Sequence, residues 1–194
     1  MSKFLTVLII ILAFSGLHAE SRGTPGFSVK MAGKESRFSL EDPRVALKKI
    51  KDAKSLKEPP IPPKGAKGAP LTAGEQEAVD TVEDLKKGYA ENKKRPDGYG
   101  LEISREIIVA LGEIKSKRSV DFLCGLLVDS KEILEFKEDI VEALRLIGDK
   151  KAVDPLKSHL EYLQKNKPAD PMVAYTWQGW IDKTQTAINE LEAK

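Results

Sequence analysis

The sequence predicts an all-α protein in which helical hairpins stack into a short solenoid. From residue 72 onward, apolar residues recur at spacings of three and four, which is the period of an amphipathic helix. Two hairpin-sized segments repeat each other at an offset of 33 residues. No stretch alternates apolar and polar residues for long enough to indicate a strand. Together these observations favour stacked helices over any mixed fold.

The expected helices follow one another with short breaks. In the first, Ala78, Val82 and Leu85 form one apolar stripe, and a turn-forming cluster of Pro, Asp and Gly ends it. Pro168 and Pro171 separate the last helix from the one before it. The expected ranges are 72–91, 101–114, 119–128, 132–147, 151–164 and 172–192.

The repeat joins these helices into pairs. Residues 108–123 align without gaps on 141–156, which places Ala110 on Ala143 and Leu111 on Leu144. The two alanines are small, so the first helix of each hairpin can approach its neighbour closely. Each hairpin leaves one apolar face uncovered, and stacking against the next hairpin covers it.

The second copy, EALRLIGDKKAVDPL (142–156), resembles the short HEAT repeats of the phycobilisome lyase type, and VALGEIKSKRSVDFL (109–123) is similar. The resemblance extends over about 101–166. It implies a short right-handed α-solenoid of HEAT-like helical hairpins over 71–194. It is specific for architecture and not for function, because such repeats also occur in phosphatase scaffolds and transport adaptors.

Residues 1–19 are expected to be a signal peptide. Lys3 precedes an uncharged apolar run over 4–17, which is shorter than the ~20 residues of a membrane-spanning helix. Small residues place the cleavage after Ala19, and an uncleaved anchor is the alternative. The mature chain is therefore expected to be periplasmic or secreted.

Residues 20–70, called the basic arm below, are rich in Pro, Gly and Lys. The arm holds 12 Lys/Arg against 6 Asp/Glu, a net charge of +6, whereas 71–194 holds 19 against 24, a net charge of −5. A short helix is expected near 43–54, docked through Leu47 and Ile50, so removal of the arm should cost only ~1–3 kcal/mol. The arm is either a linker folded onto the acidic body or a surface for anionic polymers or membrane. Its candidate binding residues are Lys48, Lys49, Lys51, Lys54 and Lys57.

The sequence predicts no catalytic, cofactor-binding or metal-binding residues. Cleavage would remove His18 and leave His159, which is expected on the solvated side of its helix, and Cys124 is expected in the core. One His and one Cys cannot supply a zinc site with three or four such ligands. We therefore expect a protein that is not an enzyme and needs no cofactor.

Aromatic residues gather in the last helix. Tyr175, Trp177 and Trp180 either cover the end of the core or form a binding platform for a glycan or a protein.

The expected function is that of a non-enzymatic exported protein-binding module, a scaffold or adaptor in the cell envelope. Its partner would be another envelope or secreted protein and not nucleic acid. Membrane contact would require an uncleaved signal segment or binding of the basic arm to an anionic surface. Two alternatives are an enzyme accessory or lyase-like HEAT protein, and a surface-binding protein that uses the arm.

Overall fold

The computed structural model describes residues 36–38, 42–62, 70–95 and 98–194. These residues form helices and connecting segments without a strand, which confirms the all-α class. None of the described helices is long and apolar enough to cross a membrane. The signal peptide expected over 1–19 lies outside the described residues and stays a prediction. The helices are α1 (Pro43–Ala53), α2 (Ala73–Asn92), α3 (Tyr99–Ile114), α4 (Val120–Val128), α5 (Leu134–Ile147), α6 (Val153–Lys165) and α7 (Pro171–Glu192), with 3-10 turns η1 (Lys117–Ser119) and η2 (Lys150–Ala152).

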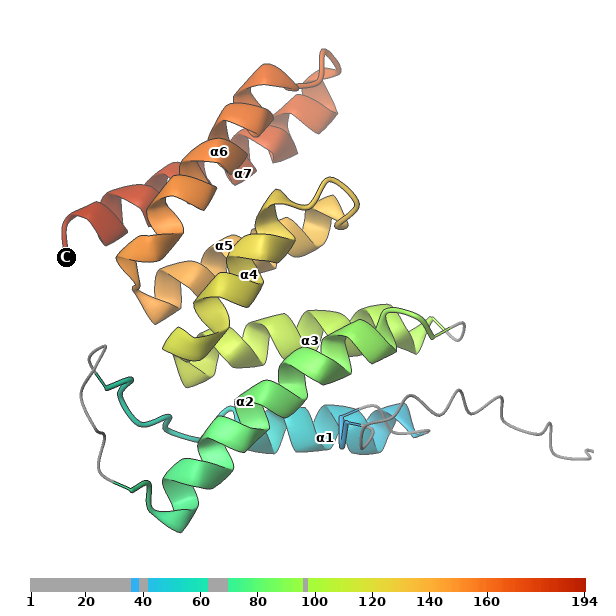
Figure 1. The fold of residues 1–194 in the computed structure, drawn as a ribbon. Helices are drawn as coiled ribbons and strands as arrows, with labels where there is room; N and C mark the ends of the chain where they lie inside the picture. Colours follow the sequence, from blue (N-terminus) through green and yellow to red (C-terminus); the bar gives the residue numbers. More distant parts are fainter. Residues whose placement is uncertain (1–35, 39–41, 63–69, 96–97) are drawn as a thin grey trace, which may run out of the picture. The chain divides into compact units, whose positions relative to one another are not determined.

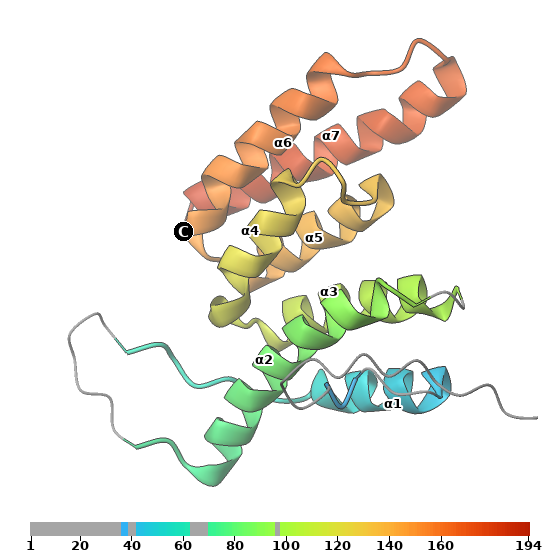
Figure 2. The ribbon, with the colours of Figure 1, turned by 45° about the vertical axis from the view of Figure 1, so that its right-hand side comes forward.

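Within the unit formed by 34–194, the helices stack in two layers. In one layer α1 packs against α3, α3 against α5, and α5 against α7. The other layer holds α2, α4 and α6, which pack against α3, α5 and α7 respectively (Figures 1 and 2). This stacking of antiparallel pairs is an α-solenoid, as the sequence predicts.

The 33-residue repeat is visible in the element boundaries. Helix α3 ends at Ile114 and α5 at Ile147, and each is followed by a 3-10 turn and a helix that begins with valine. Gly148 ends α5 in the left-handed conformation with φ 75°, and Lys115 adopts the same conformation after α3 with φ 58°. The two hairpins therefore share their turn geometry, although only one of them has the glycine that this conformation favours.

Helices α3 and α5, which belong to successive repeats, approach each other closely at Gly112. A Cβ atom on Gly112 would lie 2.7 Å from the Cα of Ala143 and 2.8 Å from its Cβ, so there is no room for a larger residue. Ala143 thus lies at a close helix–helix contact, as its small size predicted. Its partner across the contact is Gly112, two residues beyond Ala110.

Helix α1 begins as its sequence predicts. The side chain of Asp42 accepts a hydrogen bond from the Arg44 N–H at 2.9 Å, and Pro43 occupies the first turn.

Helix α1 belongs to the hydrophobic core of the described residues. Ala46, Ile50 and Ala53 are buried in the same cluster as α3, and Phe38 is buried with them. The carbonyl of Phe38 accepts a hydrogen bond from the Asn92 side chain on α2 at 2.9 Å. The described part of the basic arm is therefore packed onto the solenoid and covers the outer face of α3.

Candidate functional site

The three aromatic residues of α7 do not share one exposed surface. Trp177 is buried, and its ring N–H donates a hydrogen bond to the carbonyl of Leu163 on α6 at 2.6 Å. Trp180 is half-buried, and its ring N–H donates to Glu138 on α5 at 2.9 Å. The two indole rings lie 5.4 Å apart, whereas Tyr175 is 84% exposed. The tryptophans thus connect α7 to α5 and α6, and only Tyr175 is fully available to a partner.

The lysines of the arm fall into two groups. Lys54 is half-buried and pairs with Glu106 at 3.2 Å and with Glu113 at 3.6 Å, both on α3. These ion pairs hold the end of α1 on the solenoid. The remaining lysines of the predicted set are exposed: Lys48, Lys49, Lys51 and Lys57.

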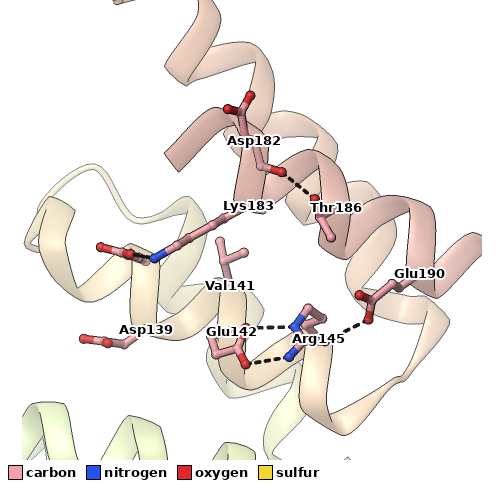
Figure 3. A pocket seen from close by; sticks show the side chains of 9 residues that line it. Asp139, Val141, Glu142, Arg145, Asp182, Lys183, Thr186 and Glu190 are labelled. Atoms are coloured by element: carbon pink, nitrogen blue, oxygen red, sulfur yellow. Dashed lines mark hydrogen bonds and ion pairs between the residues drawn. The ribbon is translucent and has the colours of Figure 1, made fainter. Parts of the chain in front are cut away.

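A charged groove of about 500 Å³ runs between α5 and α7 (Figure 3). The basic residues that line it already form ion pairs. Arg145 pairs with Glu142 at 2.7 Å and with Glu190 at 2.9 Å, while Lys183 pairs with Glu138. The hydrogen bonds from Glu142 and Glu190 raise the pKa of Arg145 above its ordinary value. A ligand would have to break these pairs, so the groove is better explained as an ionic clamp between α5 and α7.

A second polar cluster is centred on Glu132, in the segment that joins α4 to α5. Its side chain is 0% exposed and accepts hydrogen bonds from the Tyr89 hydroxyl at 2.7 Å and from the Lys93 ammonium at 2.8 Å. The N–H of Ile133 donates to the same carboxylate at 3.0 Å. Although Glu132 lies in a charge-rich segment, its carboxylate is not solvated, because α2 supplies donors that replace water around it.

The third site is a pocket of about 200 Å³ between α5 and α6, next to the Glu132 cluster. Two of its polar residues are buried: Lys137 is 7% exposed and His159 is 5% exposed. The ring of Tyr162 lies parallel to that of His159, with centroids 6.3 Å apart, and the Lys137 ammonium lies 5.8 Å from the centre of the Tyr162 ring. The pocket is lined by Leu127, Val128, Ser130, Glu132, Leu134, Lys137, Ser158, His159 and Tyr162.

Burial shifts the pKa values of both groups. Burial and, to a smaller extent, the nearby Lys137 charge lower the pKa of His159 to about 4, so the imidazole is neutral at pH 7. Burial also lowers the pKa of Lys137, although the carboxylates of Asp129 and Glu132 oppose this shift. The prediction that His159 lies on a solvated side is therefore wrong. His159 lies in a pocket whose other side is lined by residues between Leu127 and Lys137.

The sequence holds a signal for both residues. Lys137 precedes Ile140, Val141 and Leu144 at spacings of three, four and seven, which places it on the buried face of α5. His159 lies three residues after Leu156 and four before Leu163, which places it on the buried face of α6. Attention to these spacings would have identified a buried cation and a buried imidazole.

Acidification should destabilise the fold through His159. Its pKa is about 4 when folded and about 6.5 when unfolded, so the unfolded chain takes up the proton first as pH falls. Between pH 7 and pH 4, protonation of His159 should therefore lower the free energy of unfolding by on the order of 2–3 kcal/mol, allowing for solvent at the pocket. Denaturant melts of the native chain and of His159→Gln measure it. The variant should show a shallower pH dependence over this interval, and identical slopes would contradict the assignment.

Cys124 is half-buried, and burial raises its thiol pKa to about 11. The thiol is therefore protonated at neutral pH, which makes it a weak nucleophile. Over the described ranges, the side chains of His, Cys, Asp and Glu form no group of three or more that could hold a metal ion.

The chain is a distant partial homologue of a bilin biosynthesis protein, PecE of Mastigocladus laminosus. The two are 34% identical over 99 residues, which make up 50% of this chain and 36% of the relative, so the chain spans about a third of that protein. No family model matches the chain. No solved structure matches it either. The similarity contradicts the expected role as a non-enzymatic scaffold of the cell envelope, and it points to the enzyme-accessory or lyase-like alternative.

Proposed function

We propose that this chain is an accessory protein in lyase-type bilin chemistry: it binds a bilin and presents it to an enzyme. The observation that carries the proposal is the similarity to the bilin biosynthesis protein over half of this chain. The catalytic step itself is assigned to the partner enzyme, and Cys124, whose thiol is half-buried and protonated at neutral pH, has no part in it.

The chemistry of the pocket between α5 and α6 supports this role. A bilin is an open-chain tetrapyrrole with flat conjugated rings and two propionate carboxylates. Binding such a molecule requires aromatic or apolar surface for the rings and a cation for the carboxylates. Tyr162 and Val128 are exposed and line the pocket together with the Lys137 side chain.

Binding of a bilin can be measured directly. Biliverdin titrated with the folded protein should change its visible absorption in a saturable way, with a Kd on the order of 10 µM or tighter. The same protein should carry biliverdin through a gel-filtration column. Tyr175→Ala serves as the control, because this exposed ring lies outside the pocket and its loss should leave Kd unchanged. An unchanged spectrum together with elution of free biliverdin would refute the proposed function.

A further inference from the structure

The pocket between α5 and α6 contains a lysine whose side chain is largely buried. Among the described residues, no carboxylate lies within ion-pair distance of the Lys137 ammonium, which lies 5.8 Å from the centre of the Tyr162 ring. By contrast, Lys93 and Lys183 each pair with a glutamate. The carboxylates of Asp129 and Glu132 offset the partial burial of this charge only in part, so an anion from outside the chain would stabilise the Lys137 ammonium.

The negative charge nearest the pocket is already compensated. Glu132 receives hydrogen bonds from Lys93, from Tyr89 and from the backbone of Ile133. Asp129 is exposed, and its carboxylate accepts the N–H of Lys131 at 2.9 Å. Lys93 offsets the charge of Glu132, and water screens that of Asp129. An arriving carboxylate therefore meets the attraction of Lys137 with little opposing repulsion.

The walls of the pocket suit a flat ring that carries the carboxylate. The half-exposed Tyr162 ring forms one side, and apolar side chains of Leu127, Val128 and Leu134 contribute to the others. Pockets that enclose a drug-sized ligand measure about 300–1,000 Å³. The volume of about 200 Å³ therefore fits one ring with its side chain and not a whole tetrapyrrole.

We propose that this pocket binds a propionate carboxylate of the bilin, with the Lys137 ammonium as its counter-ion and the Tyr162 ring against the adjoining pyrrole. The inference rests on the proposed function and deepens it by naming the part of the bilin that is recognised. Lys137 is a binding residue in this account. His159 is neutral and supports the Tyr162 ring through stacking.

Two ligands and two lysine variants test this proposal. Lys137→Met keeps an apolar chain of similar length and removes the charge, whereas Lys131→Met removes the same charge from an exposed position in the neighbouring segment. Biliverdin should bind Lys137→Met at least ~10-fold more weakly than the native chain, which is the scale of one lost ion pair. Lys131→Met should change Kd less than ~2-fold. Biliverdin dimethyl ester, which lacks the carboxylates, should bind the native chain as weakly as biliverdin binds Lys137→Met.

Thermal melts show whether the variants remain folded. Lys137→Met should be as stable as the native chain or more stable, because it removes an unfavourable buried charge. Tyr162→Ala alters a half-exposed ring and should also raise Kd, which gives an independent variant if Lys137→Met fails to fold.

The outcomes separate the two proposals. If the native chain binds biliverdin and Lys137→Met binds it equally well, the carboxylate site is wrong while the proposed function stands. Equal weakening of biliverdin binding by Lys131→Met would also overturn the carboxylate site, since the effect would then come from the net charge of the protein and not from Lys137 itself. If the native chain binds neither ligand, the proposed function itself fails.

Discussion

Shortening the chain to 71–194 should lower the free energy of unfolding by about 4–6 kcal/mol. The described part of the arm buries Phe38 and Ile50, each worth ~1.5–3 kcal/mol, together with Ala46 and Ala53. The loss exceeds the ~1–3 kcal/mol expected from Leu47 and Ile50 alone. Since domains of this size are stable by only ~5–15 kcal/mol, the shortened chain should be marginally folded. Circular dichroism and urea melts of both chains measure the difference.

Two single substitutions serve as matched tests of the same helix. Ile50→Ala empties a fully buried position and should cost ~2–4 kcal/mol, whereas Val45→Ala alters an exposed position and should stay within ~0.5 kcal/mol. A shortened chain with native stability, or an Ile50→Ala variant with no loss, would show that α1 does not belong to the core.

Glu132→Ala should lower the free energy of unfolding by about 3–5 kcal/mol. The substitution leaves the buried Tyr89 hydroxyl and the Ile133 N–H without their acceptor, and it removes the anionic partner of Lys93. The loss should appear as a lower urea midpoint with an unchanged slope, because the folded state stays compact.

Glu161→Ala is the control for this substitution, since Glu161 is exposed on α6 and should contribute less than ~0.5 kcal/mol. A Glu132→Gln variant keeps an oxygen for one donor. Its loss of unfolding free energy should lie between those of Glu132→Ala and Glu161→Ala. If all three variants melted alike, the Glu132 cluster would not hold α2 to the segment between α4 and α5.

The helices and their repeat could be predicted because both depend on local pattern. The spacing of apolar residues places all six expected helix ends, from 91 to 192, within about one residue of those observed. The offset of 33 residues also predicts the equivalent turns at Lys115 and Gly148. The short helix near 43–54 was likewise predicted from its cap and its apolar face, and it is observed at Pro43–Ala53.

The contacts that build the candidate site could not be predicted in the same way. Glu132 is satisfied by α2, which lies about forty residues earlier in the chain, and no local pattern indicates that pairing. The enclosure of His159 depends on the path of the segment between α4 and α5. Trp177 is buried, and its ring N–H donates to the α6 backbone, which is again a contact between separate helices.

The most direct test of the central claim, that the pocket between α5 and α6 receives one ring of a bilin with its propionate, is NMR of the protein with ¹⁵N-labelled histidine. The chain has two histidines, His18 and His159, and the His159→Gln variant assigns their ring signals. Because His159 lines the pocket and stacks on Tyr162, its signals should shift on addition of biliverdin and saturate with the Kd measured by absorption. Binding detected by absorption while the His159 signals stay unmoved would contradict the claim.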